Sequence, residues 1–145
     1  MKALSGYPQW FWLMAKGWKD VENRTWPIPK TIKLPARIYL HASKHLDSFE
    51  NMQSAFRLLT FVQVDRYYEV NWKEYQGAII GEADIVDCFY YPLPGLEKLY
   101  PQRQYSVWHI PGQYGFTVAN PVLYEKPIPY KGRLGFFEVV LPTAK

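Results

Sequence analysis

The pattern of hydrophobic and polar residues changes its period near residue 7. Residues 1–6 (MKALSG) predict a short strand. From Pro8 onward the period is helical, and a proline suits the first turn of a helix because its missing N–H needs no partner there. Gly17 is typical of a helix end. We therefore expect a helix over residues 8–17, with an apolar face formed by Trp10, Leu13 and Met14.

A proline-rich segment and a strand follow this helix. Residues 25–35 (TWPIPKTIKLP) contain three prolines, which exclude a regular helix. Residues 36–42 (ARIYLHA) are rich in strand-forming side chains and predict a strand. Because successive side chains of a strand point to opposite faces, one face should carry Ile38 and Leu40 and the other Tyr39 and His41.

The middle of the chain returns to a helical period. Residues 45–61 (HLDSFENMQSAFRLLTF) predict one amphipathic helix. Its apolar stripe is expected to consist of Phe49, Met52, Phe56 and Leu59. The pattern of residues 62–75 is ambiguous, and a second short helix is one interpretation.

The second half of the chain predicts strands. The clearest is the long run over residues 77–92, with a bulge expected at Gly81. Further strands are expected at residues 106–110, 114–125 and 133–142, with turns at 111–112 and 127–132. The predicted order is strand, helix, strand, helix, and then several strands without helices between them. This order favours an α+β domain with a mostly antiparallel sheet curled into a small β-barrel with flanking helices. We expect residues 1–145 to form a single domain.

The composition agrees with one globular domain. The 145 residues are 48% hydrophobic and 21% charged, and a chain of this size can bury a core without covalent staples. The single cysteine, Cys88, leaves no partner for an internal disulfide. Aromatic residues make up 18% of the chain, which leaves several rings for stacking surfaces outside the core.

The net charge of +4 is a modest basic excess. It is compatible with a polyanionic partner and equally with an ordinary basic surface. The apolar segment near the start is too short to span a membrane, and it lacks a signal-peptide cleavage pattern. We therefore expect a cytoplasmic protein without a membrane partner.

The most informative stretch is residues 17–26 (GWKDVENRTW), where cations and carboxylates lie between tryptophans. A turn after the glycine would bring Lys19 and Glu22 together at the i, i+3 spacing. A strand resuming there would keep Glu22 and Arg24 on one side. Burial and a neighbouring arginine would lower the pKa of the lysine, while the glutamate would raise it. A surface ion-pair network at a helix end is the alternative interpretation.

Two further clusters carry candidate binding residues. The segment HASK offers His41, Ser43 and Lys44 at the end of a strand, although Ser43 could simply cap the next helix. His41 and His45 lack a third ligand, so no metal is expected. Residues 105–121 add Ser106, Trp108, Tyr114 and Asn120, which supply the hydroxyls, ring and amide that a base-recognition pocket uses. These rings could instead belong to the core.

Taken in order, these segments resemble the ASCH domain family of the PUA-like superfamily of small β-barrels. The resemblance runs from Leu4 to Val140. Its signature is the pattern Gly17, Lys19, Glu22 and Arg24. The pattern continues with IYLHASK, GAIIGEADIVDC, the stretch from Ser106 through YGF, and PIPYKGRLGFFEV. HASK and PIPYKG add independent support, because they follow in the expected order.

The resemblance implies a cleft beside the barrel that binds RNA or a nucleotide-like ligand. Some relatives hydrolyse N4-acetylcytidine with a lysine that would match Lys19, and others are ribonucleases. The hydrolytic relatives also use a residue with a hydroxyl group, and in this sequence Glu22 stands at the matching position. A second departure is Tyr7-Pro8-Gln9, which stands where relatives carry an Arg-Gln-Pro run.

The leading hypothesis is a protein that binds RNA or a modified nucleoside. Lys19 and Arg24 would contact a phosphate or a base carbonyl, and Glu22 would accept a hydrogen bond from a base or ribose. Trp108 or Tyr114 would stack on the base. No cofactor is expected, and the sequence does not indicate an oligomeric state.

Three other functions stay open. An amidohydrolase acting on N4-acetylcytidine-type nucleosides would use Lys19 as base or nucleophile, Glu22 as proton shuttle and Ser106 as oxyanion donor. A metal-independent ribonuclease would use Lys19 and Tyr114. A protein-interaction module would use the exposed part of the aromatic excess.

Overall fold

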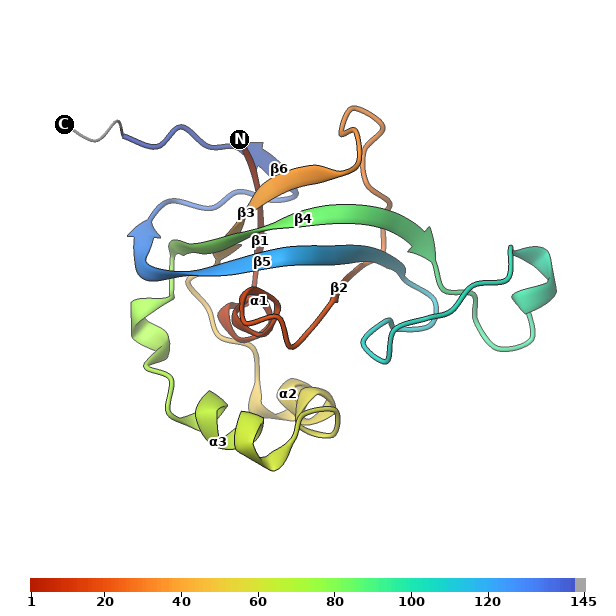
Figure 1. Cartoon of the computed structure of the whole chain (residues 1–145), viewed down its shortest axis with the longest axis horizontal. Helices are drawn as coiled ribbons and strands as arrows, with labels where there is room; N and C mark the ends of the chain where they lie inside the picture. Colours follow the sequence, from red (N-terminus) through yellow and green to blue (C-terminus); the bar gives the residue numbers. More distant parts are fainter. Residues whose placement is uncertain (143–145) are drawn as a thin grey trace.

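The computed structural model describes residues 1–142 as an α+β fold built on one strongly curled, half-barrel sheet (Figure 1). The six strands found within residues 1–142 run in the order β2-β5-β4-β3-β1-β6. They are β1 (Lys2–Gly6), β2 (Val21–Arg24), β3 (Ala36–Ala42), β4 (Ala78–Tyr90), β5 (Tyr114–Pro129) and β6 (Phe136–Glu138). The helices are α1 (Pro8–Ala15), α2 (Phe49–Phe56) and α3 (Phe61–Tyr68), with single 3-10 turns at Trp72–Glu74 and Glu97–Leu99.

The sheet is mostly antiparallel, as the sequence predicts. In the described part of the chain, only β1 and β3 pair in parallel, in a register that sets Ser5 opposite His41. Strands expected over residues 1–6, 36–42 and 77–92 are confirmed. The bulge expected at Gly81 is confirmed as well, because the register of β4 against β5 shifts between Ile79 and Gly81.

Helix α1 lies within the curl of the sheet, where it contacts β3, β4 and β5 (Figure 1). The sequence predicts one apolar face, but the helix is buried nearly all round, with Phe11, Leu13 and Met14 each at most 1% exposed. A sheet that wraps around a helix buries more than one face of it. Helices α2 and α3 lie beyond α1, on the side away from the sheet (Figure 1).

The helix predicted over residues 45–61 is wrong in its extent. The structure contains two shorter helices, α2 and α3, and the break falls at Thr60. The hydroxyl of Thr60 accepts a hydrogen bond from the backbone N–H of Gln63, whose side chain accepts one from the N–H of Thr60. This capping box starts a new helix inside the ambiguous segment, which settles residues 61–68 as helical.

One prediction for the second half is wrong, and two others are wrong only in their extent. Residues 106–110 form a turn and not a strand, because the Ser106 hydroxyl accepts a hydrogen bond from Trp108 N–H. The turn expected over residues 127–132 begins later, since β5 continues to Pro129. The closing strand is confined to Phe136–Glu138 within the expected residues 133–142.

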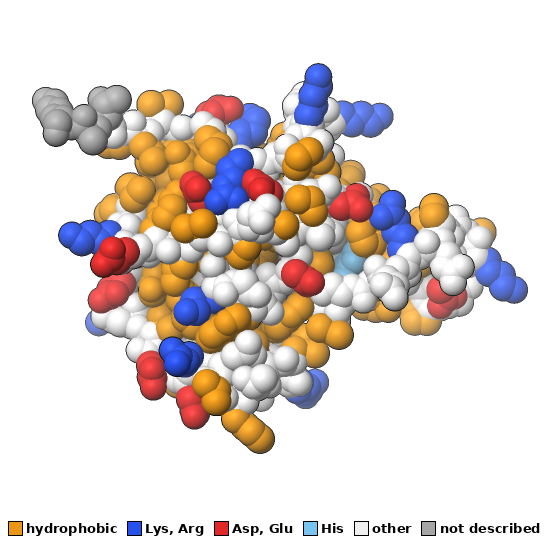
Figure 2. Space-filling view, in the orientation of Figure 1, with side chains coloured by type: hydrophobic (Ala, Val, Ile, Leu, Met, Phe, Trp, Pro, Cys, Tyr) orange, Lys and Arg blue, Asp and Glu red, His pale blue; other side chains and the backbone are white. Residues whose placement is uncertain are grey.

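The surface mixes charges of both signs. On the face seen in Figure 2, lysine and arginine side chains alternate with aspartate and glutamate side chains. Among the helices of residues 1–142, none combines the length and apolar character needed to cross a membrane.

Candidate functional site

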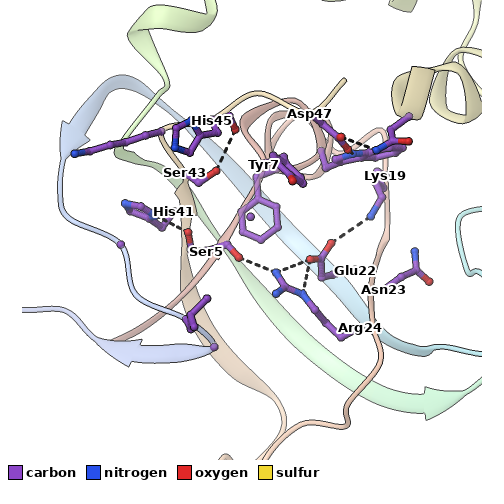
Figure 3. Close-up of a pocket in the computed structure, with 18 of the residues that line it drawn as sticks. Ser5, Tyr7, Lys19, Glu22, Asn23, Arg24, His41, Ser43, His45 and Asp47 are labelled. Atoms are coloured by element: carbon purple, nitrogen blue, oxygen red, sulfur yellow. Dashed lines mark hydrogen bonds and ion pairs between the residues drawn. The ribbon is translucent and has the colours of Figure 1, made fainter. Parts of the chain in front are cut away.

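A cavity of about 1080 Å³ opens where the end of β1, the start of α1, β2 and the segment after β3 meet the loop 130–135 (Figure 3). Its wall includes the side chains of Tyr7, Trp10, Lys19, Glu22, Arg24 and His41. The volume lies just above the range typical of small-molecule sites. Charged side chains from one short segment and aromatic rings from another therefore face a common space.

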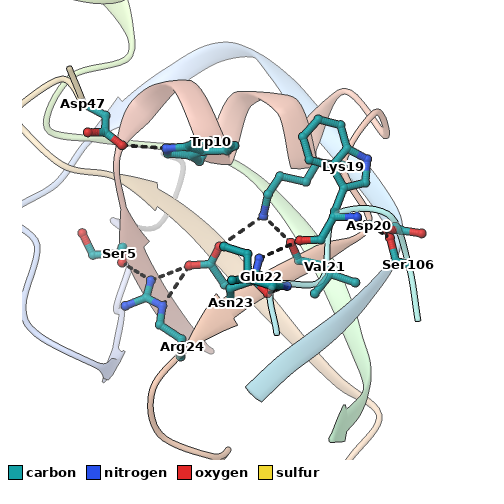
Figure 4. A network of polar contacts seen from close by, with 12 residues as sticks. Ser5, Trp10, Lys19, Asp20, Val21, Glu22, Asn23, Arg24, Asp47 and Ser106 are labelled. Atoms are coloured by element: carbon teal, nitrogen blue, oxygen red, sulfur yellow. Dashed lines mark hydrogen bonds and ion pairs between the residues drawn. The ribbon is translucent and has the colours of Figure 1, made fainter. Parts of the chain in front are cut away.

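Three charged side chains form the floor of the cavity, which we call the charged floor: Lys19, Glu22 and Arg24 (Figure 4). The Glu22 carboxylate lies between the two cations, with Oε1 3.5 Å from Lys19 Nζ and Oε2 2.8 Å from Arg24 Nη2. Lys19 is 4% exposed and Glu22 is 8% exposed. Buried charges of this kind are stable only when paired, so the three groups hold one another in place.

The local sequence explains this convergence. Gly17 adopts a φ of +77°, which is open to glycine and costly for other residues. The chain reverses there, so that the N–H groups of Trp18 and Lys19 both donate to the carbonyl of Leu13. Strand β2 then begins at Val21, and its alternation sends Glu22 and Arg24 to the same side. The i, i+3 contact and the strand alternation expected from the sequence are both present.

Burial dominates the electrostatics of Lys19. It lowers the pKa of the ammonium, and the neighbouring Glu22 only partly offsets this effect. The ammonium also donates to the carbonyl of Val21 and lies 5.7 Å from the centre of the Trp10 ring. A lysine with a lowered pKa has a larger neutral fraction near neutral pH, and the neutral amine is the form that acts as base or nucleophile.

Arg24 joins the charged floor to β1. Its Nε donates to Glu22 Oε2 at 2.8 Å, and its Nη2 donates to the carbonyl of Ser5 at 2.7 Å. The guanidinium also lies 5.6 Å from the centre of the Trp26 ring. Within residues 1–142, no hydrogen bond from Nη1 is found.

Aromatic side chains form a second wall. Tyr7 is 46% exposed at the entrance to α1. Trp10 is fixed by a hydrogen bond of 2.8 Å from its indole N–H to Asp47 Oδ2. Trp108 lines the cavity and is buried, with its backbone carbonyl accepting a hydrogen bond from Asn23. Rings held in this way offer flat surfaces at little entropic cost.

The HASK segment contributes a buried histidine. His41 is 1% exposed; its Nδ1 lies 2.9 Å from Ser5 Oγ, and its Nε2 lies 2.6 Å from the carbonyl oxygen of Tyr130. Burial lowers the pKa of His41 and is only partly offset by the Tyr130 carbonyl. The imidazole is therefore neutral at pH 7.

The other two HASK residues also line the cavity. The hydroxyl of Ser43 donates to the carbonyl of His45 at 3.2 Å, and Lys44 is exposed. The alternative capping role of Ser43 is wrong, because Ser48 is the residue that caps α2. Across the part of the chain that the structure describes, no group of three or more potential metal ligands is found.

Three of the candidate residues do not line the cavity: Ser106, Tyr114 and Asn120. The Ser106 hydroxyl donates to Asp20 Oδ1 at 2.5 Å (Figure 4). Tyr114 packs against Tyr90, with 5.2 Å between the ring centres. Asn120 donates from its side-chain amide to Asp84 at 3.0 Å. Of the cluster at residues 105–121, Trp108 is the candidate that reaches the cavity wall.

Sequence reasoning missed several cavity residues: Ser5, Asp47, Lys131 and Arg133. Ser5 and His41 lie far apart in the chain and meet only through the parallel pairing of β1 with β3. Lys131 falls in a segment expected to be a turn, and Arg133 is the first residue of the strand expected over residues 133–142. Their place beside the cavity depends on how β5 and β6 return to the sheet, which the local pattern does not show.

Comparison with known proteins does not assign a family: no family model and no curated protein matches the chain.

Proposed function

We propose that the cavity binds a ligand containing a nucleobase, either a modified nucleoside or the same unit within RNA. The observation that carries this proposal is the charged floor, buried and directed into a cavity that also has aromatic walls. The resemblance of the segments that line it to the ASCH domain family supports the same class of ligand.

The groups of the charged floor match the chemistry of a base edge. Lys19 and Arg24 are donors suited to a base carbonyl or a phosphate, and Glu22 is an acceptor suited to a base N–H or a ribose hydroxyl. A base edge that carries a carbonyl beside an N–H would contact both kinds of group at once. Tyr7, the most exposed aromatic residue of the cavity wall, is positioned to stack on the base.

Cations at the mouth of the cavity suit the phosphates that accompany a base in a nucleotide or in RNA. Lys44, Lys131 and Arg133 line the opening, and all three are exposed. None of them forms an ion pair with another residue of the described chain, 1–142. We call these three residues the rim cations.

The direct test is calorimetric titration with cytidine, N4-acetylcytidine and a short single-stranded RNA. Glu22→Gln keeps the side-chain volume and replaces one acceptor oxygen by a donor amide, so binding should weaken by about 10-fold, the effect of losing one hydrogen bond to a charged group. Glu138→Gln makes the same change on an exposed residue outside the cavity and should leave affinity unchanged. Equal affinity of both variants and wild type for every ligand would refute the proposal.

A second candidate function is hydrolysis of an acylated nucleoside such as N4-acetylcytidine. The lowered pKa of Lys19 favours it, because a neutral amine can act as a base or nucleophile. Chromatography of free N4-acetylcytidine after incubation with wild type and with Lys19→Ala tests this function. Conversion by wild type that disappears in the variant would support hydrolysis. If folded wild type converts none of the nucleoside, ligand binding stays as the proposed function.

A further inference from the structure

Ser5 and His41 form a contact whose direction can be assigned. A carbonyl oxygen only accepts hydrogen bonds, so the 2.6 Å contact with Tyr130 places the proton of the neutral ring on Nε2 of His41. The lone pair of Nδ1 then faces Ser5, and the serine hydroxyl donates its proton to it across 2.9 Å. The serine hydroxyl is thus hydrogen-bonded to a base, and a backbone carbonyl holds that base in its tautomer.

The pair lies at the cavity wall with its base shielded and its hydroxyl closer to the open space. Both residues line the cavity, but His41 is fully buried whereas Ser5 is half-buried (Figure 3). Gly132 covers the imidazole so closely that a Cβ at this position would lie 2.5 Å from Cε1 of His41 and 3.2 Å from Ser5 Oγ. A glycine there lets the loop 130–135 close over the ring.

We propose that Ser5 and His41 are a nucleophile–base pair, and that Ser5 accepts the acyl group of a small ester or amide held in the cavity. This activity goes beyond the proposed binding function, because it needs no nucleobase. It also differs from hydrolysis through Lys19, since the acyl group would be bound to the side-chain oxygen of Ser5 and not to the side-chain nitrogen of Lys19.

The two half-reactions balance without a cofactor. Ser5 Oγ attacks the carbonyl carbon while its proton passes to Nδ1 of His41; the bond to the leaving group then breaks, and the leaving group takes that proton. Water next attacks the acyl-serine and gives a proton to Nδ1, the bond between Oγ and the acyl carbon breaks, and Oγ recovers the proton. The products are a carboxylic acid and an alcohol or amine.

A cation stands next to the nucleophile. Arg24 donates from Nη2 to the backbone carbonyl of Ser5 itself, which fixes the guanidinium beside this residue. Its Nη1 has no partner within residues 1–142 and can donate to the negative oxygen that forms when Oγ attacks. The same arginine would thus serve base recognition and acyl transfer.

The test uses p-nitrophenyl acetate as the acyl donor, with release of p-nitrophenolate followed by absorbance. Acid-quenched samples are digested, and the acetylated peptides are mapped by mass spectrometry with and without hydroxylamine. Hydroxylamine removes an acetyl group from a serine oxygen but not from a lysine nitrogen, so Ser5 is distinguished from Lys19. Ser54→Ala serves as the control, because Ser54 also lines the cavity but its hydroxyl donates to the Asn51 carbonyl and, within residues 1–142, is hydrogen-bonded to no base.

We expect a hydroxylamine-sensitive acetyl group on Ser5 that disappears in Ser5→Ala. His41→Gln should slow its formation by about 100-fold, the effect of losing a general base, and Ser54→Ala should leave the rate unchanged. Folded wild type without acetyl on Ser5, or an equal rate in folded His41→Gln, would overturn the proposal. The wild-type peptide map decides the question even if His41→Gln does not fold. Since no nucleoside is used, this test can fail while the binding function stands.

Discussion

Glu22 is the residue on which the charged floor depends. It is the only carboxylate with an ion pair to either cation of that floor within residues 1–142, and it contacts both. Without it, Lys19 and Arg24 would be two like charges facing each other, the former fully buried. The role of Glu22 in the fold and its role toward a ligand therefore rest on the same two oxygens.

Glu22→Ala should lower the free energy of unfolding by about 3 kcal/mol, because removing one partner of a buried ion pair leaves an uncompensated charge. Urea unfolding followed by circular dichroism measures the change. Glu138→Ala is the matched control, since it breaks the exposed ion pairs with Lys2 and with the amino group of Met1, and exposed pairs contribute little. Equal losses in the two variants would mean that burial does not strengthen the pairing at Glu22.

At the scale of elements, the sequence predicts those structural features that depend on residues close together in the chain. Strand β3 and the start of α1 follow from alternation and from proline chemistry, and the approach of Lys19 to Glu22 follows from the turn at Gly17. The features that the sequence does not predict have two causes. Thr60 breaks a continuous apolar period by capping a new helix, and Ser5 reaches His41 only through strand pairing, which no local window contains.

Thr60→Ala tests the break between α2 and α3. Loss of the cap should lower the free energy of unfolding by about 1 kcal/mol. Thr31→Ala, at an exposed threonine in the loop before β3 whose side chain makes no hydrogen bond within the described chain, should have little effect. A gain in stability at position 60 would instead indicate one continuous helix, because alanine favours a helix interior more than threonine does.

At the scale of the whole molecule, the net charge of +4 is too small to specify a polyanion partner by itself. Acidic and basic side chains are interspersed on the face in Figure 2, so the rim cations matter more by their place at the cavity mouth than by their number. Affinity for RNA and affinity for a nucleoside should consequently respond differently to salt.

For single-stranded RNA, three phosphate contacts by the rim cations would lower the binding constant by about 100-fold for each tenfold rise in salt. Cytidine carries no phosphate, so its affinity should change little. Fluorescence anisotropy for RNA and calorimetry for cytidine measure the two slopes. Replacing Lys44, Lys131 and Arg133 by alanine should flatten the RNA slope, whereas replacing the exposed Lys30, Lys33 and Lys98 should not. A steep slope for RNA that persists without the rim cations would place the phosphates elsewhere.

The position of β1 has a consequence for how the protein is made. This strand lies between β3 and β6, and the amino group of Met1 donates to the carbonyl of Val139, 138 residues away. Before the ribosome has added β6, the nascent chain can pair β1 with β3, but the other edge of β1 stays unpaired. Unpaired strand edges can pair with other chains. We therefore expect the sheet to be completed only after synthesis has passed residue 138, in a late step that brings the two ends of the described chain together.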